Sequence, residues 1–347
     1  MALWPVIQPG CQAEASKTFM ANAPLVHVDR LDVRIIREMG IRPYLTRPKN
    51  PDALKASHLA RRLNRSVNTI KTRVARMEAD GVIAGYQVIP NLRHLGLTGV
   101  AYYFTSPIDE KKEEAMAAIA QMDGLLEIHD FLGRGFCIDF THADSAALER
   151  SLATLAGITG EESPVKFYER DMPQVKRPLT NLDWRILAAL RFQAKRSLDE
   201  VGAELGVTGR TVRSRYARMA AEGSFFAVPM LDPSRAGGLF LFEILLYIED
   251  GQFDAVTAEF HRRLDGAHVY AKAPSSPELG HWDALVFAHN TAEVEQLRAS
   301  AAAIPGVARA DAWLFRGLHD HGEWLDDAMT AMIGTAASAH AGSAGPP

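Results

Sequence analysis

The chain has 347 residues, a net charge of −4 at pH 7, 47% hydrophobic residues and two cysteines. At roughly 100–200 residues per domain, this length predicts two to four globular domains. No apolar run reaches the roughly 18 residues that cross a bilayer, and the N-terminus lacks the basic start and apolar core of a secretory signal. Two cysteines exclude a disulfide framework or a Cys-rich zinc site. We therefore expect a cytoplasmic protein with no membrane partner.

Charge is segregated along the chain. The net charge is +8 over residues 28–96, −8 over 97–175, +5 over 176–238 and −9 over 239–330. A basic segment beside an acidic one favours a module that binds a polyanion, carried on a unit that repels it. The alternative is chance surface composition. Residues 1–27 and the Ala-, Gly-, Ser- and Pro-rich residues 331–347 are expected to be a disordered leader and tail.

The basic segments also resemble each other. Leu31–Ile36 recurs as Leu182–Leu187, and Thr69–Met77 recurs as Thr211–Met219, with an offset of 142 residues for the second pair. This long period predicts a tandem duplication rather than a short solenoid repeat.

Each basic segment is predicted to form three helices. Apolar residues at helical spacing indicate the helices, Ser66 and Thr208 suit the N-cap of the third one, and Gly81 and Gly223 follow its end. The extended stretches 82–90 and 224–230 then read as wing or linker strands. We therefore predict winged helix-turn-helix domains over residues 28–96 and 176–238.

The outward face of each third helix is rich in polar and basic residues. A DNA major groove admits one α-helix, and Arg, Lys, Asn and Thr side chains can bond to its base edges and phosphates. The alternatives are a solvated helix face and, for Arg73 and Arg215, bonds to the ends of neighbouring helices. The candidate residues for binding double-stranded DNA are Asn68, Thr69, Lys71, Thr72, Arg73, Arg76, Arg210, Thr211, Arg213, Ser214, Arg215 and Arg218.

The acidic segments are predicted to be small α+β units. Residues 98–105, 109–122, 125–132, 136–141, 145–156 and 165–170 give the order βαββαβ, and residues 239–315 repeat it. This order is typical of ferredoxin-like sandwiches, which we place at 97–175 and 239–330. Such sheets often pair face to face across a dyad, and here the two copies could pair within one chain.

The motifs resemble one family. Leu-Asp-x-x-Ile, then Thr-(Ile/Val)-x-x-Arg, then Gly81-Val-Ile-x-Gly-Tyr86, all ahead of βαββαβ, are similar to the Lrp/AsnC family of transcription factors over about residues 28–320. In the second copy Gly223-Ser-Phe-Phe226 replaces the last motif. The resemblance implies RAM-type ligand-sensing sandwiches, a chain that acts as a pseudo-dimer, homo-oligomers, and a small-molecule effector such as an amino acid.

The resemblance also implies an effector site near the hairpin between the second and third strands of a sandwich. Gly280-His281-Trp282-Asp283 matches the Gly-x-x-Asp pattern found there, whereas Gly133–Phe136 in the first copy lacks the acid. A glycine amide and a carboxylate could hold an α-amino acid. An ordinary hairpin turn is the alternative.

These observations predict a sequence-specific regulator without cofactor or metal, and not an enzyme. Its target should be an imperfect palindrome, with half-sites spaced by a multiple of about 10 bp. The alternative is an enzyme of heme biosynthesis, because siroheme decarboxylases are similar two-unit proteins with a His-x-Tyr-x-Arg segment. His268-Val-Tyr-Ala-Lys272 and His129-Asp-Phe131 resemble that segment, and such a histidine could donate a proton.

Overall fold

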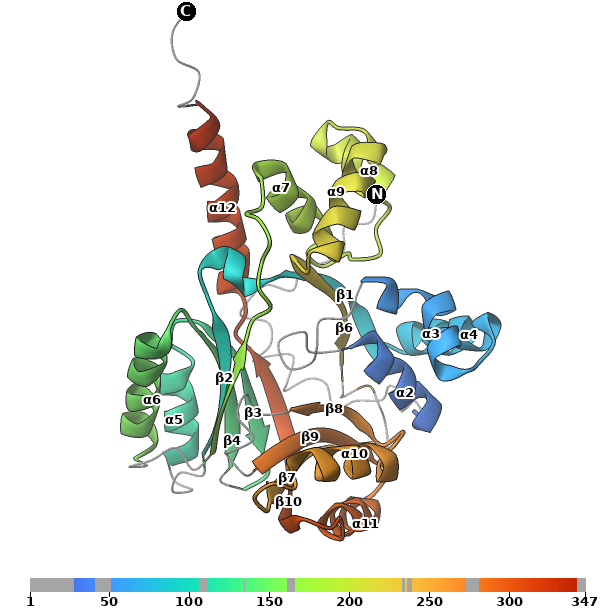
Figure 1. Ribbon diagram of the computed structural model, residues 1–347, viewed down its shortest axis with the longest axis vertical. Coiled ribbons are helices and arrows are strands. Elements are labelled where there is room, and N and C mark those ends of the chain that lie inside the picture. Colours follow the sequence, from blue (N-terminus) through green and yellow to red (C-terminus); the bar gives the residue numbers. More distant parts are fainter. Residues whose placement is uncertain are drawn as a thin grey trace, which may run out of the picture.

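The computed structural model describes residues 28–40, 51–105, 111–133, 135–160, 166–232, 235, 239–272 and 281–341 (Figure 1). The chain is a mixed α and β protein whose sheets are antiparallel throughout. Among these residues no helix is both long and apolar enough to cross a membrane. The leader 1–27 lies outside the described residues.

The first half begins with helices α2 (Arg30–Met39), α3 (Ala56–Leu63) and α4 (Val67–Ala79), followed by strand β1 (Ile83–Pro90). As expected, Ser66 caps α4 by accepting a hydrogen bond from the Thr69 amide at 3.0 Å. The turn between α3 and α4 is tight because Asn64 adopts a left-handed conformation, which Asn tolerates better than most residues.

The following elements of the first half are β2 (Gly99–Thr105), α5 (Lys112–Ile119), β3 (Leu125–Phe131), β4 (Phe136–His142), α6 (Ser145–Thr159) and β5 (Lys166–Asp171). Their order agrees with the predicted strand–helix–strand–strand–helix–strand pattern. Helix α5 is shorter than the expected 109–122, because its described part begins at Lys112 and the chain turns after Ala120.

The second half repeats this order. It contains α7 (Asn181–Leu190), α8 (Leu198–Leu205), α9 (Gly209–Ala221), β6 (Phe225–Leu231), β7 (Phe240–Ile248), α10 (Phe253–Arg263), β8 (His268–Lys272), β9 (His281–Ala288), α11 (Thr291–Ala302) and β10 (Val307–Asp320). Thr208 caps α9 as expected, accepting from the Thr211 amide at 3.2 Å.

The two sets of four strands join into one sheet of order β5-β2-β4-β3-β10-β7-β9-β8. The seam is the antiparallel pairing of β3 with β10, in which Phe131 lies opposite Phe315. The two copies thus pair within one chain through β10, which pairs with β7 over Val307–Leu314 and with β3 over Phe315–Asp320, and the inner-face side chains of His129 and Glu243 lie 3.0 Å apart. Strand β10 runs on to Asp320, beyond the predicted 308–315, and its added length supplies the hydrogen-bonding edge that β3 uses.

Strands β1 and β6 form a separate two-stranded sheet. Tyr86 pairs with Pro229, and Gln87 pairs with Val228. With the 142-residue offset between the two copies, Pro229 is the counterpart of Gln87 and Val228 is the counterpart of Tyr86. The register therefore has a local two-fold axis between these pairs, so the predicted linker strands of the two halves meet as symmetric equivalents.

Four helices, α5, α6, α10 and α11, cover one face of the large sheet. Helices α5 and α6 pack on residues such as Tyr103 and Phe140, and α10 and α11 pack on residues such as Phe242 and Val286 (Figure 1). The opposite face, with Phe131 and Leu245, belongs to the same apolar cluster as the three-helix units. The face of the sheet opposite α5, α6, α10 and α11 is thus buried in the described part of the chain, where it contacts the three-helix units.

The last helix is α12 (Trp324–Ala341), which corrects the expectation of a disordered tail over 331–347 as far as Ala341. Alanine-rich sequence favours helix. Leu325 and Met329 are buried, and the Asn181 side-chain amide donates to the Ile333 carbonyl at 2.6 Å. Packing against α7 therefore stabilises α12, whose amino-acid composition alone does not predict a folded segment.

Candidate functional site

One buried carboxylate holds α9 to α7. Asp183 is fully buried, and its oxygens accept from Arg215 at 3.0 Å and from Arg218 at 2.8 Å. Burial acts to raise the pKa of Asp183, but hydrogen bonds from Thr180 and Arg215, together with the charge of Arg218, outweigh it and lower the pKa. Asp183 therefore stays ionised and fixes the orientation of α9.

The same arrangement occurs in the first half. Asp32 is fully buried and accepts hydrogen bonds from Arg73 and Arg76, and Arg73 also bonds to Asp29 at the N-cap of α2. Arg215 likewise donates to Thr180, the N-cap of α7, at 3.0 Å. Of the alternatives for Arg73 and Arg215, bonding to a neighbouring helix end is the one observed.

The remaining candidate DNA-binding residues lie at the surface. Thr69 and Thr211 are half-buried, with their hydroxyls 2.8 and 2.9 Å from the hydroxyls of the capping Ser66 and Thr208. Arg213 is exposed and paired with Asp199 at 2.7 Å. The other exposed candidates are Asn68, Lys71, Thr72, Arg210 and Ser214. The structure thus separates the predicted set into arginines that build the helical unit and side chains that face solvent.

Helix α2 is docked on the edge of the large sheet. Arg37 of α2 donates to Asp265 at 2.6 Å, and its guanidinium lies 3.2 Å from His268 Nε2 on β8. His261 Nδ1 is 2.9 Å from the same nitrogen. Burial, together with the positive charge of Arg37, lowers the pKa of His268 to about 4, so this histidine is neutral at pH 7 and serves as packing between α2 and α10.

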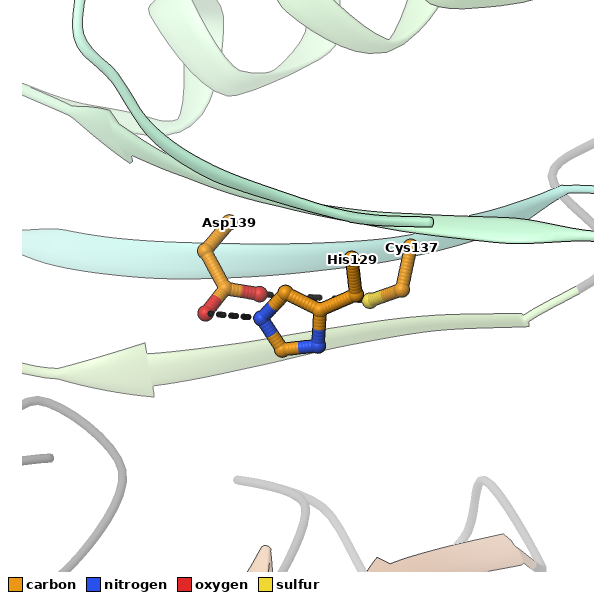
Figure 2. Close-up of side chains that lie close together, drawn as sticks. All are labelled: His129, Cys137 and Asp139. Atoms are coloured by element: carbon orange, nitrogen blue, oxygen red, sulfur yellow. Dashed lines mark hydrogen bonds and ion pairs between the residues drawn. The ribbon is translucent and has the colours of Figure 1, made fainter. Parts of the chain in front are cut away.

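A polar cluster lies in the middle of the inner sheet face. His129 on β3 is fully buried, with Nδ1 3.0 Å from Glu243 on β7 and Nε2 3.4 Å from Glu127 and 3.5 Å from Asp139. Cys137 on β4 completes a set in which one ligand atom each of His129, Cys137 and Asp139 lies within 4.8 Å of the others (Figure 2). These are groups that bind metals or move protons.

A second charged group holds the sheet seam. Asp130 on β3 is buried and pairs with Lys112 at 2.6 Å and with Arg316 of β10 at 2.5 Å. Burial acts to raise the pKa of Asp130, but hydrogen bonds from His319, Lys112 and Arg316 outweigh it and lower the pKa to about 2. His319 of β10 is thus part of a charge network across the seam.

The predicted effector residues are only partly described. Gly280 lies outside the described residues, and His281 and Trp282 lie in β9, where the structure describes the backbone alone. Asp283 is fully buried on β9, opposite Leu245 of β7. The carboxylate is therefore placed inside the molecule, while the rest of this prediction stays open.

The sequence analysis missed the polar cluster around His129. His129 was noted only for its resemblance to a decarboxylase segment, and Cys137, Asp139 and Glu243 were not singled out. Cys137 and Asp139 alternate along one strand, which places both on one face of the sheet. Alternation of polar residues in an otherwise apolar strand was the available signal. Glu243, 114 residues from His129, gave none.

The comparisons with known proteins match one helix-turn-helix segment of the chain and, separately, the fold of most of the chain. Residues 179–220, which contain α7, α8 and most of α9, match the AsnC-type helix-turn-helix domain. A crystal structure of the siroheme decarboxylase NirDL is similar over 88% of this chain and 99% of its own, with a TM-score of 0.52 and 11% identity. AsnC of Escherichia coli, at 20% identity, matches 45% of this chain and 98% of its own with a TM-score of 0.26. No curated protein matches the chain.

These matches correct one expectation. The prediction that the chain is not an enzyme is contradicted, because two structures similar over 88% of its length are of the siroheme decarboxylase NirDL, one of them with an iron-uroporphyrin III analogue. At 11% identity the likeness concerns the fold. From residues 179 to 220, the chain carries a helix-turn-helix segment of the AsnC type.

Proposed function

We propose that the chain is a DNA-binding transcriptional regulator of the Lrp/AsnC type, built from two winged helix-turn-helix domains that alternate with two ferredoxin-like units. The observation that carries the proposal is the AsnC-type helix-turn-helix over residues 179–220, with α9 anchored by Asp183 and Arg210, Arg213 and Ser214 exposed. A rigid helix with a basic outer face is what insertion into a major groove requires.

The first three-helix unit supports the same function. Asp32 anchors α4 as Asp183 anchors α9, and Asn68, Lys71 and Thr72 remain exposed on α4. The symmetric pairing of β1 with β6 relates the two units by a local two-fold axis. A pair of helices related in this way is the arrangement in which regulators read two half-sites. We infer that one chain acts as a pseudo-dimer that arose by tandem duplication.

The charge distribution supports an orientation in which the helical units, rather than the large sheet, face the DNA. The two helical segments carry net charges of +8 and +5, whereas the two segments that form the large sheet carry −8 and −9. DNA is attracted by the first pair and repelled by the second. Because four basic residues on α4 and α9 are engaged by Asp32 and Asp183, we assign the DNA contacts to Lys71, Arg210 and Arg213 with their neutral neighbours.

DNA fragments selected from a genomic library by the purified chain test this proposal. We expect Lys71→Ala and Arg210→Ala each to weaken binding to a selected fragment about tenfold, since one good base or phosphate contact is worth about 1–3 kcal/mol. Affinity should also fall steeply as salt is raised. The matched control is Arg262→Ala, an exposed arginine on α10 that pairs with Glu259. Unchanged affinity in both helix variants would contradict the assignment.

An effector and self-association belong to the proposal as well. Asp283 supplies a buried carboxylate on β9. This carboxylate supports the binding of a small cationic or zwitterionic effector, such as an amino acid, at residues 280–283. The long β-sheet ends in edge strand β5 on the side away from α2, and edge strands are where sheets associate. We therefore propose homo-oligomers joined through the acidic units.

The second candidate is a decarboxylase that acts on a tetrapyrrole. It is favoured by the shared fold over 88% of the chain and by the buried His129 on the inner sheet face. Against it, Glu127, Asp139 and Glu243 surround His129, so a substrate carboxylate brought there meets three others. Anaerobic incubation with siroheme tests this candidate, because loss of carbon dioxide lowers the mass of the tetrapyrrole.

A further inference from the structure

We propose that His129, Cys137 and Asp139 form a binding site for a divalent transition metal such as Zn²⁺, with Glu127 at its solvent side. All three are at least nine-tenths buried, and one ligand atom of each lies within 4.8 Å of the other two (Figure 2). Imidazole, thiolate and carboxylate are the groups that bind Zn²⁺ in proteins. This site is independent of the proposed function.

The orientation of the imidazole is the first argument. His129 Nδ1 lies 3.0 Å from Glu243 Oε1, and Nδ1 is the donor of that bond when Glu243 is an ionised carboxylate, which can only accept. In the neutral ring the other nitrogen then presents a lone pair. That lone pair faces the carboxylates of Glu127 and Asp139 at 3.4 and 3.5 Å. A metal ion seated among these atoms would bind the nitrogen lone pair and both carboxylates, and the alternative occupant is a proton on Nε2 or on one of the carboxyl groups.

The distances between the ligand atoms are the second argument. Bond lengths of about 2.0–2.3 Å in a tetrahedral zinc site place neighbouring ligand atoms about 3.3–3.8 Å apart. His129 Nε2 is 3.5 Å from one Asp139 oxygen, and Cys137 Sγ is 3.9 Å from the other. The first separation lies within this range and the second is slightly above it, so small shifts of the Cys137 and Asp139 side chains would seat an ion between them.

The surroundings are the third argument. A metal-bound histidine usually donates its second ring N–H to a carboxylate, which fixes the ring and strengthens the ligand, and Glu243 does so here. The rings of Phe131 and Phe315 lie 6.4 and 5.4 Å from the imidazole, so the ion would sit in an apolar layer. Glu127 is the member whose side chain is a quarter exposed, and it supplies the fourth ligand on the solvent side.

The site would also join the two halves of the chain. His129 lies on β3, whereas Glu243 lies on β7, and β10 pairs with β7 over Val307–Leu314 and with β3 over Phe315–Asp320. Metal binding to the folded state stabilises it by mass action. We therefore expect the ion to stabilise the whole large sheet rather than one unit of it.

Cobalt titration tests this site. The full chain is purified without a polyhistidine tag, stripped with chelator and titrated with Co²⁺, whose bond to a thiolate gives a near-ultraviolet charge-transfer band. We expect the band to saturate at one ion per chain, to disappear on adding Zn²⁺, and to be absent in Cys137→Ser. The control Cys11→Ser, which changes the other cysteine, keeps the band. Binding by Co²⁺ without this band, or a band that survives in Cys137→Ser, overturns the site.

A second experiment tests whether Glu243 positions the His129 ring for metal binding. Glu243→Gln should weaken Co²⁺ binding about 10- to 100-fold while the thiolate band at saturation stays unchanged, because the first shell is intact. Circular dichroism and metal-free Tm of each variant show that it is folded. If the chain binds no Co²⁺ or Zn²⁺ at all, and wild-type Tm does not rise with either ion, the positive charge on the cluster is a proton and the metal proposal is wrong.

Discussion

Two aspartates decide which arginines of the helical units are available to a ligand. Asp32 and Asp183 occupy the same place in α2 and α7, and each accepts from two arginines of its third helix. A buried carboxylate without partners would be costly, so the arginines are required by the fold itself. A basic residue on a recognition helix is therefore assigned to DNA only after its partners within the protein are known.

Removal of the buried charge should weaken the second helical unit. We expect Asp183→Asn to lower the free energy of unfolding by about 2 kcal/mol, since hydrogen bonds to charged groups contribute about 1.5–3 kcal/mol. The control is Asp199→Asn, which breaks the exposed pair with Arg213 and should cost less than about 0.5 kcal/mol. Urea denaturation of the full chain measures both, and equal losses would show that burial of Asp183 has no energetic consequence.

At the scale of elements, one helix is attached to the large sheet by titratable groups. Helix α2 contacts β8 through Arg37, which faces His268, His261 and Asp265. The pKa of His268 is lowered to about 4, and the pKa of His261 is also lowered, first by burial and then by the charge of Arg37. Protonation of His268 would place a second positive charge beside Arg37, so acid works against this contact.

The pH dependence of stability follows from the direction of that shift. Between the unfolded pKa of 6.5 and the folded pKa of about 4, the unfolded chain binds more protons at His268, so stability is lost as pH falls through this window. From about pH 7 to about pH 5 the loss from His268 is about 2 kcal/mol. Urea midpoints at the two pH values measure it.

His268→Gln tests this dependence directly. The variant should lose less stability than the wild type on acidification, whatever its stability at neutral pH. His58→Gln, at the surface of α3, serves as the control and should keep the wild-type difference. An unchanged pH difference in His268→Gln would show that the acid response arises elsewhere.

The sequence predicts local structure well and partners across the sheet poorly. Periodic apolar residues and the caps Ser66 and Thr208 define helices α4 and α9, because these signals lie within one helix. The pairing of β3 with β10 depends on which sheet edges meet in the folded chain. Neither strand has a residue pattern that identifies the other as its neighbour. For the same reason the contact of Glu243 with His129 could not be predicted from the sequence, because the two residues meet only when the halves of the chain have joined.

For the whole molecule, the two interfaces between the halves differ in symmetry. Strands β1 and β6 are counterparts and pair as in a symmetric dimer, with Tyr86 opposite Pro229 and Gln87 opposite Val228. Strands β3 and β10 are not counterparts, since the fourth strand of one unit meets the second strand of the other. Strands β1 and β6 therefore keep a local two-fold relation that the large sheet lacks.

This arrangement predicts the form of the target DNA. Selection from a randomised library should return two half-sites in inverted orientation, spaced by a multiple of about 10 bp and different in sequence. The difference arises because Asn68, Lys71 and Thr72 on α4 are replaced by Arg210, Arg213 and Ser214 on α9. A perfect inverted repeat among the selected sites would contradict this prediction, and a direct repeat would contradict the two-fold relation of the helices.

The pairing of β1 with β6 inside one chain has a genetic consequence. In a homodimer every codon change appears in both subunits, so both arms of an operator are affected together. Here a change at Lys71 leaves Arg210 untouched, because each belongs to a different stretch of the same gene. Under the proposed function, each half-operator would therefore diverge on its own while the other half keeps the protein bound.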